Sequence, residues 1–328
     1  MAEWLNPFKE LGLDSRDRKI MYELDVNARQ SSAQIAKKLR LDKAVVNYRI
    51  KKLLDAEVIL GFYTIIDTTK LGYEGYRLYL KFQNLDAKKE GEITSFIVKS
   101  PLTWWVGSID GNWDMGVLLW VRNVYELKKF WCEFMEKYGE YVQDEVISVY
   151  ANLYHFSYAF IYPGKVAEPA MQEVGSAEKV QATENEEKVL RVLAENARMP
   201  TVEIAEKTGL TPMVVKYAIK KMSENGVIKG FRVMFNLGLL NYTYYKVDVN
   251  ISDFSRYSAL FDFARAQPNV IYIDRTIGAG DLEMNLLVET HEQFHDIMRE
   301  LKAKFPGVVR DYSYMIYSKI HKIAYYQH

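Results

Sequence analysis

Residues 43–53 place cationic, amide and phenolic side chains at a spacing that suits contact with a nucleic acid. The apolar Val46, Ile50 and Leu53 recur at intervals of four and three, which is the period of one face of an α-helix. The outward positions of this helix hold Lys43, Ala44, Asn47, Tyr48 and Lys51, with Arg49 and Lys52 at its flanks. Amide and cationic groups hydrogen-bond base edges and neutralise phosphates. We therefore predict that this surface faces double-stranded DNA, with Arg49 and Lys52 on phosphate.

A second surface of this kind lies 169 positions further along the chain. Residues 14–63 and 183–232 align without a gap and share 19 identities in 50 positions, where average amino-acid usage gives about three. The chain is therefore a tandem duplication. The second predicted DNA-facing set comprises Thr211 as helix N-cap, Pro212, Lys216, Tyr217, Lys220 and Lys221. Because Asn47 is replaced by Lys216 and Arg49 by Ala218, we expect the two units to recognise different half-sites.

Each surface carries a modest positive charge in a chain that is neutral overall. Residues 14–63 hold eleven Lys or Arg against seven Asp or Glu, a net charge of +4, and residues 183–232 hold nine against seven, a net charge of +2. A net charge of zero for the whole chain argues against non-specific binding to polyanions. Runs of charge are usually solvated surface, so the recurrence of the pair Lys51 and Lys52 as Lys220 and Lys221 is what favours DNA.

A second motif with chemical meaning is the H-E-x-x-H pattern of His291, Glu292 and His295, which on a helix directs two imidazoles to one face for zinc. The matching residues of the first copy, 124–128, hold no histidine, and a capped helix start explains the segment equally well. We therefore expect no metal and no cofactor. The sequence also lacks a phosphate-binding loop, a dinucleotide fingerprint and a nucleophile triad, so it gives no support for an enzyme.

The element that positions the first surface is a helix-turn-helix. The preceding helix has an apolar face made of Ile35, Ala36 and Leu39. Only residues 40–42 separate the two helices, which requires a tight turn. We expect Arg40 in this turn to contact phosphate and Asp42 to cap the second helix. Residues 57–63 then form a strand that enters a wing.

The order of helix, helix-turn-helix and a strand that reads Glu57-Val58-Ile59-Leu60-Gly61-Phe62 resembles the Lrp/AsnC, or feast/famine, transcription regulators, in a tandem form of archaeal type. The resemblance implies a sequence-specific DNA-binding transcription regulator. It also implies an α+β fold in which two winged helix-turn-helix domains alternate with two ferredoxin-like (βαββαβ) domains. In this family a glycine-acid turn lies near the effector or assembly surface. At offset 169 we align Gly111 and Asp114 with Gly280 and Glu283, and because the turns differ, an amino-acid effector is not implied.

Alternating apolar residues and helix caps outline the domains. The predicted order is a winged helix-turn-helix in 1–64, a ferredoxin-like domain in 65–162, a linker in 163–181, a second winged helix-turn-helix in 182–233 and a second ferredoxin-like domain in 234–328. Asn123 with Glu126 should form a capping box, and Thr290 with Gln293 its counterpart. Two residues are missing from the second copy, and we place this gap directly before its last helix.

Composition limits the class of protein. The chain has 328 residues, of which 49% are hydrophobic and 26% charged, as in soluble proteins with two to four small domains. It has one cysteine, no apolar run of about 18 residues and no signal-peptide pattern, so we expect a cytoplasmic protein without a membrane segment. The tryptophans and tyrosines of the ferredoxin-like domains fall at positions expected for core or interface packing.

Two alternatives stay open at this level. The linker lets the two halves fold back on each other as an internal pseudo-dimer, but each half can instead pair with its counterpart in a second chain, which gives a homo-oligomer. The second unit, with Pro212 and Met213 at its exposed start, can bind DNA or contact a protein of the transcription machinery, such as a basal transcription factor.

Overall fold

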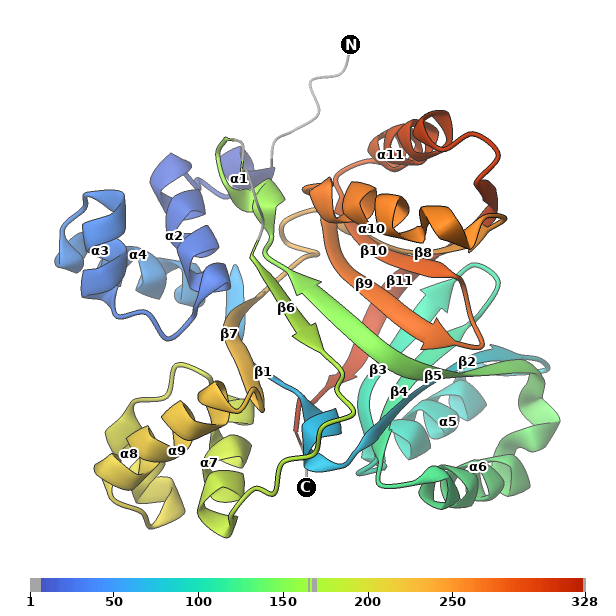
Figure 1. The fold of residues 1–328 in the computed structure, drawn as a ribbon, viewed down its shortest axis with the longest axis horizontal. Coiled ribbons are helices and arrows are strands. Elements are labelled where there is room, and N and C mark those ends of the chain that lie inside the picture. The colour runs from blue at the N-terminus through green and yellow to red at the C-terminus, as the bar shows by residue number, and fades with distance from the viewer. Residues whose placement is uncertain (1–6, 165, 167–169, 327–328) are drawn as a thin grey trace.

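Two similar halves follow one another in a computed structural model that describes residues 7–164, 166 and 170–326 (Figure 1). The first half contains α1 (Pro7–Glu10), α2 (Ser15–Val26), α3 (Ser32–Leu39), α4 (Lys43–Asp55), β1 (Ile59–Ile66), β2 (Glu74–Phe82), α5 (Ala87–Lys99), β3 (Thr103–Asp110), β4 (Met115–Val121), α6 (Val124–Tyr138) and β5 (Val142–Phe156). After β6 (Met171–Val174), the second half contains α7 (Glu184–Glu195), α8 (Thr201–Thr208), α9 (Pro212–Glu224), β7 (Ile228–Phe235), β8 (Thr243–Ile251), α10 (Tyr257–Ala266), β9 (Val270–Ile277), β10 (Leu282–Val288), α11 (His291–Lys304) and β11 (Val309–Ile323). The predicted α+β fold class is confirmed.

The eight ferredoxin-like strands form one closed antiparallel ring. Each half contributes four strands, in the order β5-β2-β4-β3 in the first half and β11-β8-β10-β9 in the second. The last strand of each half also pairs with the other half, β5 with β9 and β11 with β3. Helices α5 and α6 cover the outer face of one side, and α10 and α11 cover the other (Figure 1). The halves therefore associate within one chain, as the internal pseudo-dimer requires.

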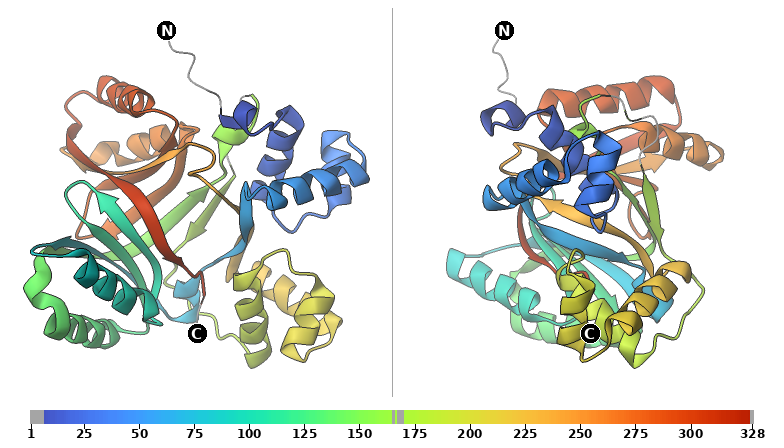
Figure 2. Two further views of the ribbon diagram at one scale, coloured as in Figure 1. Left: turned by 180° about the vertical axis from the view of Figure 1, so that it is seen from behind. Right: turned by 90° about the vertical axis from the view of Figure 1, so that its left-hand side faces the viewer.

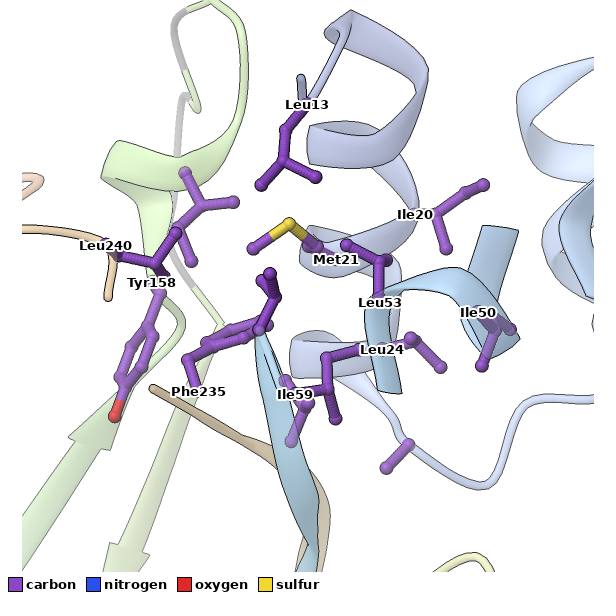
Figure 3. Close-up of a cluster of buried hydrophobic side chains, with 14 of the residues drawn as sticks. Leu13, Ile20, Met21, Leu24, Ile50, Leu53, Ile59, Tyr158, Phe235 and Leu240 are labelled. Atoms are coloured by element: carbon purple, nitrogen blue, oxygen red, sulfur yellow. The ribbon is translucent and has the colours of Figure 1, made fainter. Parts of the chain in front are cut away.

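The first helix-turn-helix unit packs on the second half of the chain as well as on itself. Figure 3 shows Met21, Leu24 and Leu53 of this unit beside Phe235 of β7 and Leu240. All five side chains are buried, and full burial of such a side chain stabilises the fold by about 1.5–3 kcal/mol. The orientation of the unit is thus fixed by a core that both halves build.

The strand after each helix-turn-helix does not fold back into a wing hairpin of its own. Instead β1 pairs antiparallel with β7, with Tyr63 opposite Arg232 and Thr64 opposite Phe231. We call this two-stranded sheet the β1–β7 ribbon. Residues after β1 pass directly through a short helix, Thr68–Leu71, into β2, so each unit supplies one strand and its partner comes from the other half.

The predicted linker is partly ordered into the sheet. Residues 171–174 form β6, which pairs with the end of β5, with Met171 opposite Phe156. The strand at 171–174 was not predicted, because four residues are too few to show a period in the sequence. Residues 165 and 167–169 of the predicted linker lie outside the described part of the chain.

The structure also corrects the alignment of the glycine-acid turns. The carboxylate of Asp114 accepts the Phe82 N–H at 2.7 Å, and that of Asp281 accepts the Ile251 N–H at 2.7 Å, so these two residues are equivalent at offset 167. Gly111 and Gly278 share a positive φ, 142° and 96°, and occupy the same turn position. The gap therefore precedes β9 and corresponds to the shorter α10, not to the last helix. Gly280 and Glu283 are not the counterparts of Gly111 and Asp114.

The caps of α6 and α11 follow one variant of the predicted capping box. Asn123 accepts from the N–H of Glu126, and Thr290 accepts from the N–H of Gln293. The return bond reaches one residue further back than predicted, from the Arg122 N–H to Glu126 and from the Glu289 N–H to Gln293. The predicted helix starts are therefore confirmed, but the return bond of each capping box comes from the residue before the predicted donor.

Candidate nucleic-acid interface

The predicted DNA-facing residues lie on the solvent side of α4 and α9. The exposed set of the first unit is Arg40, Asp42, Lys43, Ala44, Asn47, Tyr48, Lys51 and Lys52, and that of the second is Thr211, Pro212, Lys216, Tyr217 and Lys220. Tyr48 and Tyr217 expose 69% and 67% of their surface. Both units lie on one flank of the molecule, on either side of the β1–β7 ribbon (Figure 1, Figure 2). The two exposed surfaces thus belong to units on the same flank of the molecule.

The turn of the first unit is held without the predicted cap. Arg40 follows α3 in the left-handed conformation, with a φ of 54°, where the second copy has Gly209 with a φ of 68°. Asp42 occupies the N-cap position of α4 but makes no side-chain hydrogen bond there. Thr211 accepts from the Val214 N–H at 3.3 Å, so the cap prediction holds for α9 and fails for α4.

Arg49 does not project freely from α4. Its guanidinium lies 2.9 Å from Asp14 and 2.7 Å from Asp17, and its side chain exposes only 18% of its surface. Although burial lowers the pKa of Arg49, the hydrogen bonds to Asp17 and Asp14 raise it overall. Arg49 therefore anchors α4 to α2, and the contact with phosphate that we predicted would compete with these two carboxylates.

Lys221 joins α9 to α7 in the second unit, as Arg49 joins α4 to α2, but from a different position on its helix. Its ammonium group lies 2.8 Å from Glu186, the residue equivalent to Asp17 at offset 169. The hydrogen bond to Glu186 raises the pKa of Lys221. Lys52, the counterpart of Lys221, is exposed, with its ammonium 3.5 Å from the Gly12 carbonyl. The copies thus use different cations to hold the same helix pair, and the contact of Lys221 with phosphate, which we predicted, would compete with Glu186.

Two arginines for which we predicted no role join the two units, each by bonds to carbonyls of the other unit. Arg29 donates to the Ala197 and Met199 carbonyls at 2.7 and 3.1 Å, and Arg198 donates in return to the carbonyls of Ala28 and Gln30. Both arginines were visible as identities between the copies, but their partners lie on the opposite unit. This reciprocal pair holds the separation between the two DNA-facing surfaces.

A buried ion pair on one side only was also missed. Arg232 of β7 donates to Asp25 of α2 at 2.7 and 2.8 Å, and Asp25 also accepts the Tyr158 N–H at 2.6 Å. The equivalent positions in the other copy hold Ala194 and Tyr63. The ribbon is therefore electrostatically asymmetric, although its two strands match in length.

The two acids that we predicted at glycine-acid turns, Asp114 of the first copy and Glu283 of the second, differ in exposure. Asp114 is 37% exposed in its side chain and pairs with Lys81 at 2.6 Å. Glu283 is completely buried inside the ring and lies 2.6 Å from both Arg77 and Lys246. Because Arg77 belongs to the first half and Glu283 to the second, Glu283 lies in a buried charge network at the contact between the two halves.

The H-E-x-x-H segment forms the start of α11. His291 and His295 approach each other with their Nε2 atoms 2.7 Å apart, and His291 Nδ1 lies 2.9 Å from the Tyr245 hydroxyl. Within the described ranges, no group of three or more His, Cys, Asp or Glu side chains is arranged to hold a metal ion. Over the same part of the chain, none of the helices combines the length and apolar character needed to cross a bilayer.

Comparison with known proteins adds to this geometry. A family model described as winged helix-turn-helix DNA-binding matches residues 13–59 and 183–229. The chain is 34% identical over 134 residues to the proline dehydrogenase transcriptional activator of Rhodobacter capsulatus, which covers 39% of this chain and 85% of that protein. It is 25% identical over 144 residues to the HTH-type transcriptional regulator FL11 of Pyrococcus horikoshii, which covers 44% and 94%. The solved structure of the siroheme decarboxylase NirDL matches 96% of this chain and 94% of that chain with a TM-score of 0.64. At 13% identity, this likeness shows the fold alone.

Proposed function

The chain belongs to the Lrp/AsnC family of transcription regulators, and from this premise we propose that it binds double-stranded DNA sequence-specifically through two non-identical helix-turn-helix units. The observation that carries the proposal is the exposure of both outward helix faces on one flank of the molecule. Exposed aromatic and cationic side chains on one face of a helix can contact base edges and phosphates in the major groove of DNA. Catalysis is not part of the proposal, because the relatives found by sequence are regulators.

In the first unit, Lys43, Asn47, Tyr48 and Lys51 face the groove, with Ala44 close to the bases and Arg40 and Lys52 on phosphate. Asn47 pairs with adenine, since an amide can donate to and accept from that base edge. In the second unit, Lys216, Tyr217 and Lys220 face the groove. Lys216 in place of Asn47 changes the base preference, so the natural operator is asymmetric.

The test compares salt dependence in matched double variants. Replacing Lys51 and Lys52 by alanine, or Lys216 and Lys220 by alanine, should each lower DNA affinity and flatten the log–log salt slope by about 0.9 for every phosphate that is no longer neutralised. The control is Lys128→Ala with Lys129→Ala, an exposed lysine pair on α6 at the outer face of the ring. An unchanged slope in both test variants would contradict DNA binding by these helices. Equal protection of a perfect palindrome by both units would contradict the asymmetric operator.

One observation favours a second candidate for α9. Met213 exposes 80% of its surface at the start of this helix, and large exposed apolar side chains are typical of protein contacts. In this version the first unit binds DNA and the second contacts a protein of the transcription machinery. DNA affinity unaffected by the Lys216 and Lys220 pair, but lowered by the Lys51 and Lys52 pair, would select this candidate.

A further inference from the structure

Two histidines at the start of α11 have no part in the proposed function. His291 and His295 are one helical turn apart, their Nε2 atoms lie 2.7 Å from each other, and neither ring is buried. The cap that explains this segment is made by Thr290 and Gln293, and it uses neither imidazole. Figure 1 shows α11 on the side of the molecule away from α4 and α9. The pair is therefore open to solvent and lies apart from the DNA-facing surfaces.

The geometry of the pair suits a shared metal ion. Bonds from zinc to imidazole nitrogen measure about 2.0–2.1 Å, so two nitrogens on one ion lie about 2.8–3.4 Å apart at octahedral or tetrahedral angles. The observed separation of 2.7 Å between the Nε2 atoms is close to the lower end of this range. The ring centroids of His291 and His295 lie 4.2 Å apart. Rings that met end to end in a linear hydrogen bond would have centroids about 5 Å apart. The two rings are therefore inclined to each other, as two ligands of one ion are.

The surroundings of His291 favour the tautomer that a metal ion requires. An imidazole binds a metal ion through a nitrogen without hydrogen, so its other nitrogen must carry the hydrogen. His291 Nδ1 lies 2.9 Å from the Tyr245 hydroxyl, whose oxygen can accept this N–H. Without an ion, one Nε2–H donates to the other Nε2. Binding of an ion requires only that this hydrogen move to Nδ1 of the same ring.

One acidic side chain beside the pair compensates for its place on the helix. The first turn of a helix is the positive end of the helix dipole, which disfavours a bound cation. Glu292 lies in the first turn of α11 and is exposed. Its carboxylate supplies the negative charge that a cation needs at this end.

The nature of the ligands selects the class of metal ion. Within the described residues, no third His, Cys, Asp or Glu side chain completes the group, so water fills the other coordination positions. Imidazole nitrogen suits Zn²⁺, Ni²⁺ and Cu²⁺, with Cu²⁺ the tightest, whereas Mg²⁺ and Ca²⁺ prefer oxygen. At the equivalent positions, offset 167, the first copy has Val124 and Lys128, which cannot form such a pair.

We propose that His291 and His295 bind one divalent transition-metal ion per chain, with Cu²⁺ preferred and with His291 oriented by the Tyr245 hydroxyl. The two Nε2 atoms are the ligating atoms. The site deepens none of the DNA contacts, and it belongs to the second ferredoxin-like domain alone.

Binding is tested on the full chain with Cu²⁺. Isothermal titration gives the stoichiometry and the affinity, and electron paramagnetic resonance gives the number of nitrogens on the ion. We expect one tight site with two nitrogens, weaker binding of Zn²⁺ at the same site, and no competition from Mg²⁺. His295→Ala should leave one nitrogen and weaken the affinity about 100-fold, since partners that only orient a ligating histidine already contribute about 10–100-fold.

Two further variants distinguish a built site from loose binding by single histidines. Tyr245→Phe keeps the ring that stacks on Phe294, with centroids 4.3 Å apart, but lacks the hydroxyl beside His291, and it should weaken Cu²⁺ about tenfold. His321→Ala is the matched control, because it removes a histidine of β11 whose partner is Ser108, and it should leave the affinity unchanged.

The outcomes decide the site without reference to DNA. A single nitrogen on Cu²⁺ in the parent, unchanged affinity in His295→Ala, or equal weakening in His321→Ala would overturn the proposal. His291→Ala, at a more exposed position, gives the same reading if His295→Ala folds poorly. Because DNA takes no part in these measurements, the metal site and the proposed function are tested separately.

Discussion

A buried ion pair holds the first helix-turn-helix unit against the rest of the protein. Asp25 and Arg232 face each other with both side chains at most 1% exposed, and the copy related by the pseudo-twofold has neutral residues there. A buried pair contributes little net stability over a neutral pair of similar size, but removal of one partner leaves an uncompensated charge. The two copies therefore fill the same packing position differently, one with an ion pair and the other with Ala194 and Tyr63.

Removal of Arg232 alone should destabilise the fold strongly. We expect Arg232→Met to lower the free energy of unfolding by about 3–5 kcal/mol, because Asp25 stays buried without a cation. The double variant Asp25→Ala with Arg232→Tyr installs the residues of the other copy and should recover at least half of that decrease. Urea unfolding of the three proteins measures both effects, and a single variant as stable as the parent would show that the pair does not matter.

Burial, together with the nearby charge of Arg232, lowers the pKa of His155 to about 3, and the neutral ring gives stability a pH dependence. The folded protein binds no proton at His155 until the pH nears 3, whereas the unfolded chain binds one below its ordinary pKa of 6.5. This contribution is fully present above pH 6.5 and is lost as the pH falls toward 3, by about 1.4 kcal/mol per pH unit. The free energy of unfolding of the parent, measured relative to that of His155→Gln at pH 7, 6 and 5, should decrease once the pH is below 6.5. Parallel curves would refute the buried neutral ring.

At the scale of elements, the equivalent helices α4 and α9 are followed by different residues in the same backbone conformation. Glu57 and Gly226 are equivalent residues with positive φ, 54° and 74°. A residue with a side chain is strained in this conformation, and glycine is not. The first unit therefore carries local strain next to its β1 strand that the second unit lacks.

Substitutions at these two positions should change the free energy of unfolding in opposite directions. Glu57→Gly is expected to raise the free energy of unfolding by about 1 kcal/mol relative to Glu57→Ala, and Gly226→Ala to lower it by about 1–2 kcal/mol. Thermal unfolding monitored by circular dichroism gives both values, with Glu57→Ala as the control for removal of the charge. A stabilising Gly226→Ala would contradict the left-handed conformation at this position.

At the scale of the molecule, the ring and the ribbon make the two halves one folding unit. The pairings of β1 with β7, β3 with β11 and β5 with β9 all join one half to the other. A half on its own would expose these strand edges, which are ready to pair with another chain.

Residues 1–164 and 170–328 produced as two polypeptides in one cell should therefore assemble as a 1:1 complex. Native mass spectrometry gives the stoichiometry directly. Arg29→Ala with Arg198→Ala should weaken the contact between the units without dissolving the complex, because the ring pairings persist. Halves that purify separately, or only as pairs of identical halves, would contradict the pairing across the chain.

The sequence by itself determined the elements and their repetition. Helical period and caps are local properties, so α4, α9 and the βαββαβ order follow from residues close together in the chain. The outward positions of Asn47, Tyr48 and Lys51 follow from the same period.

Only the tertiary structure decided which cations are free and where the two halves meet. Arg49 and Lys221 have the same outward spacing as their neighbours, but carboxylates on α2 and α7 hold them. The β1–β7 ribbon depends on strand partners more than 90 residues apart, as the pairing of Tyr63 with Arg232 shows. The period of side chains along a strand fixes which face is apolar, but it does not specify the partner strand, because any antiparallel neighbour with a matching face satisfies the same backbone hydrogen bonds.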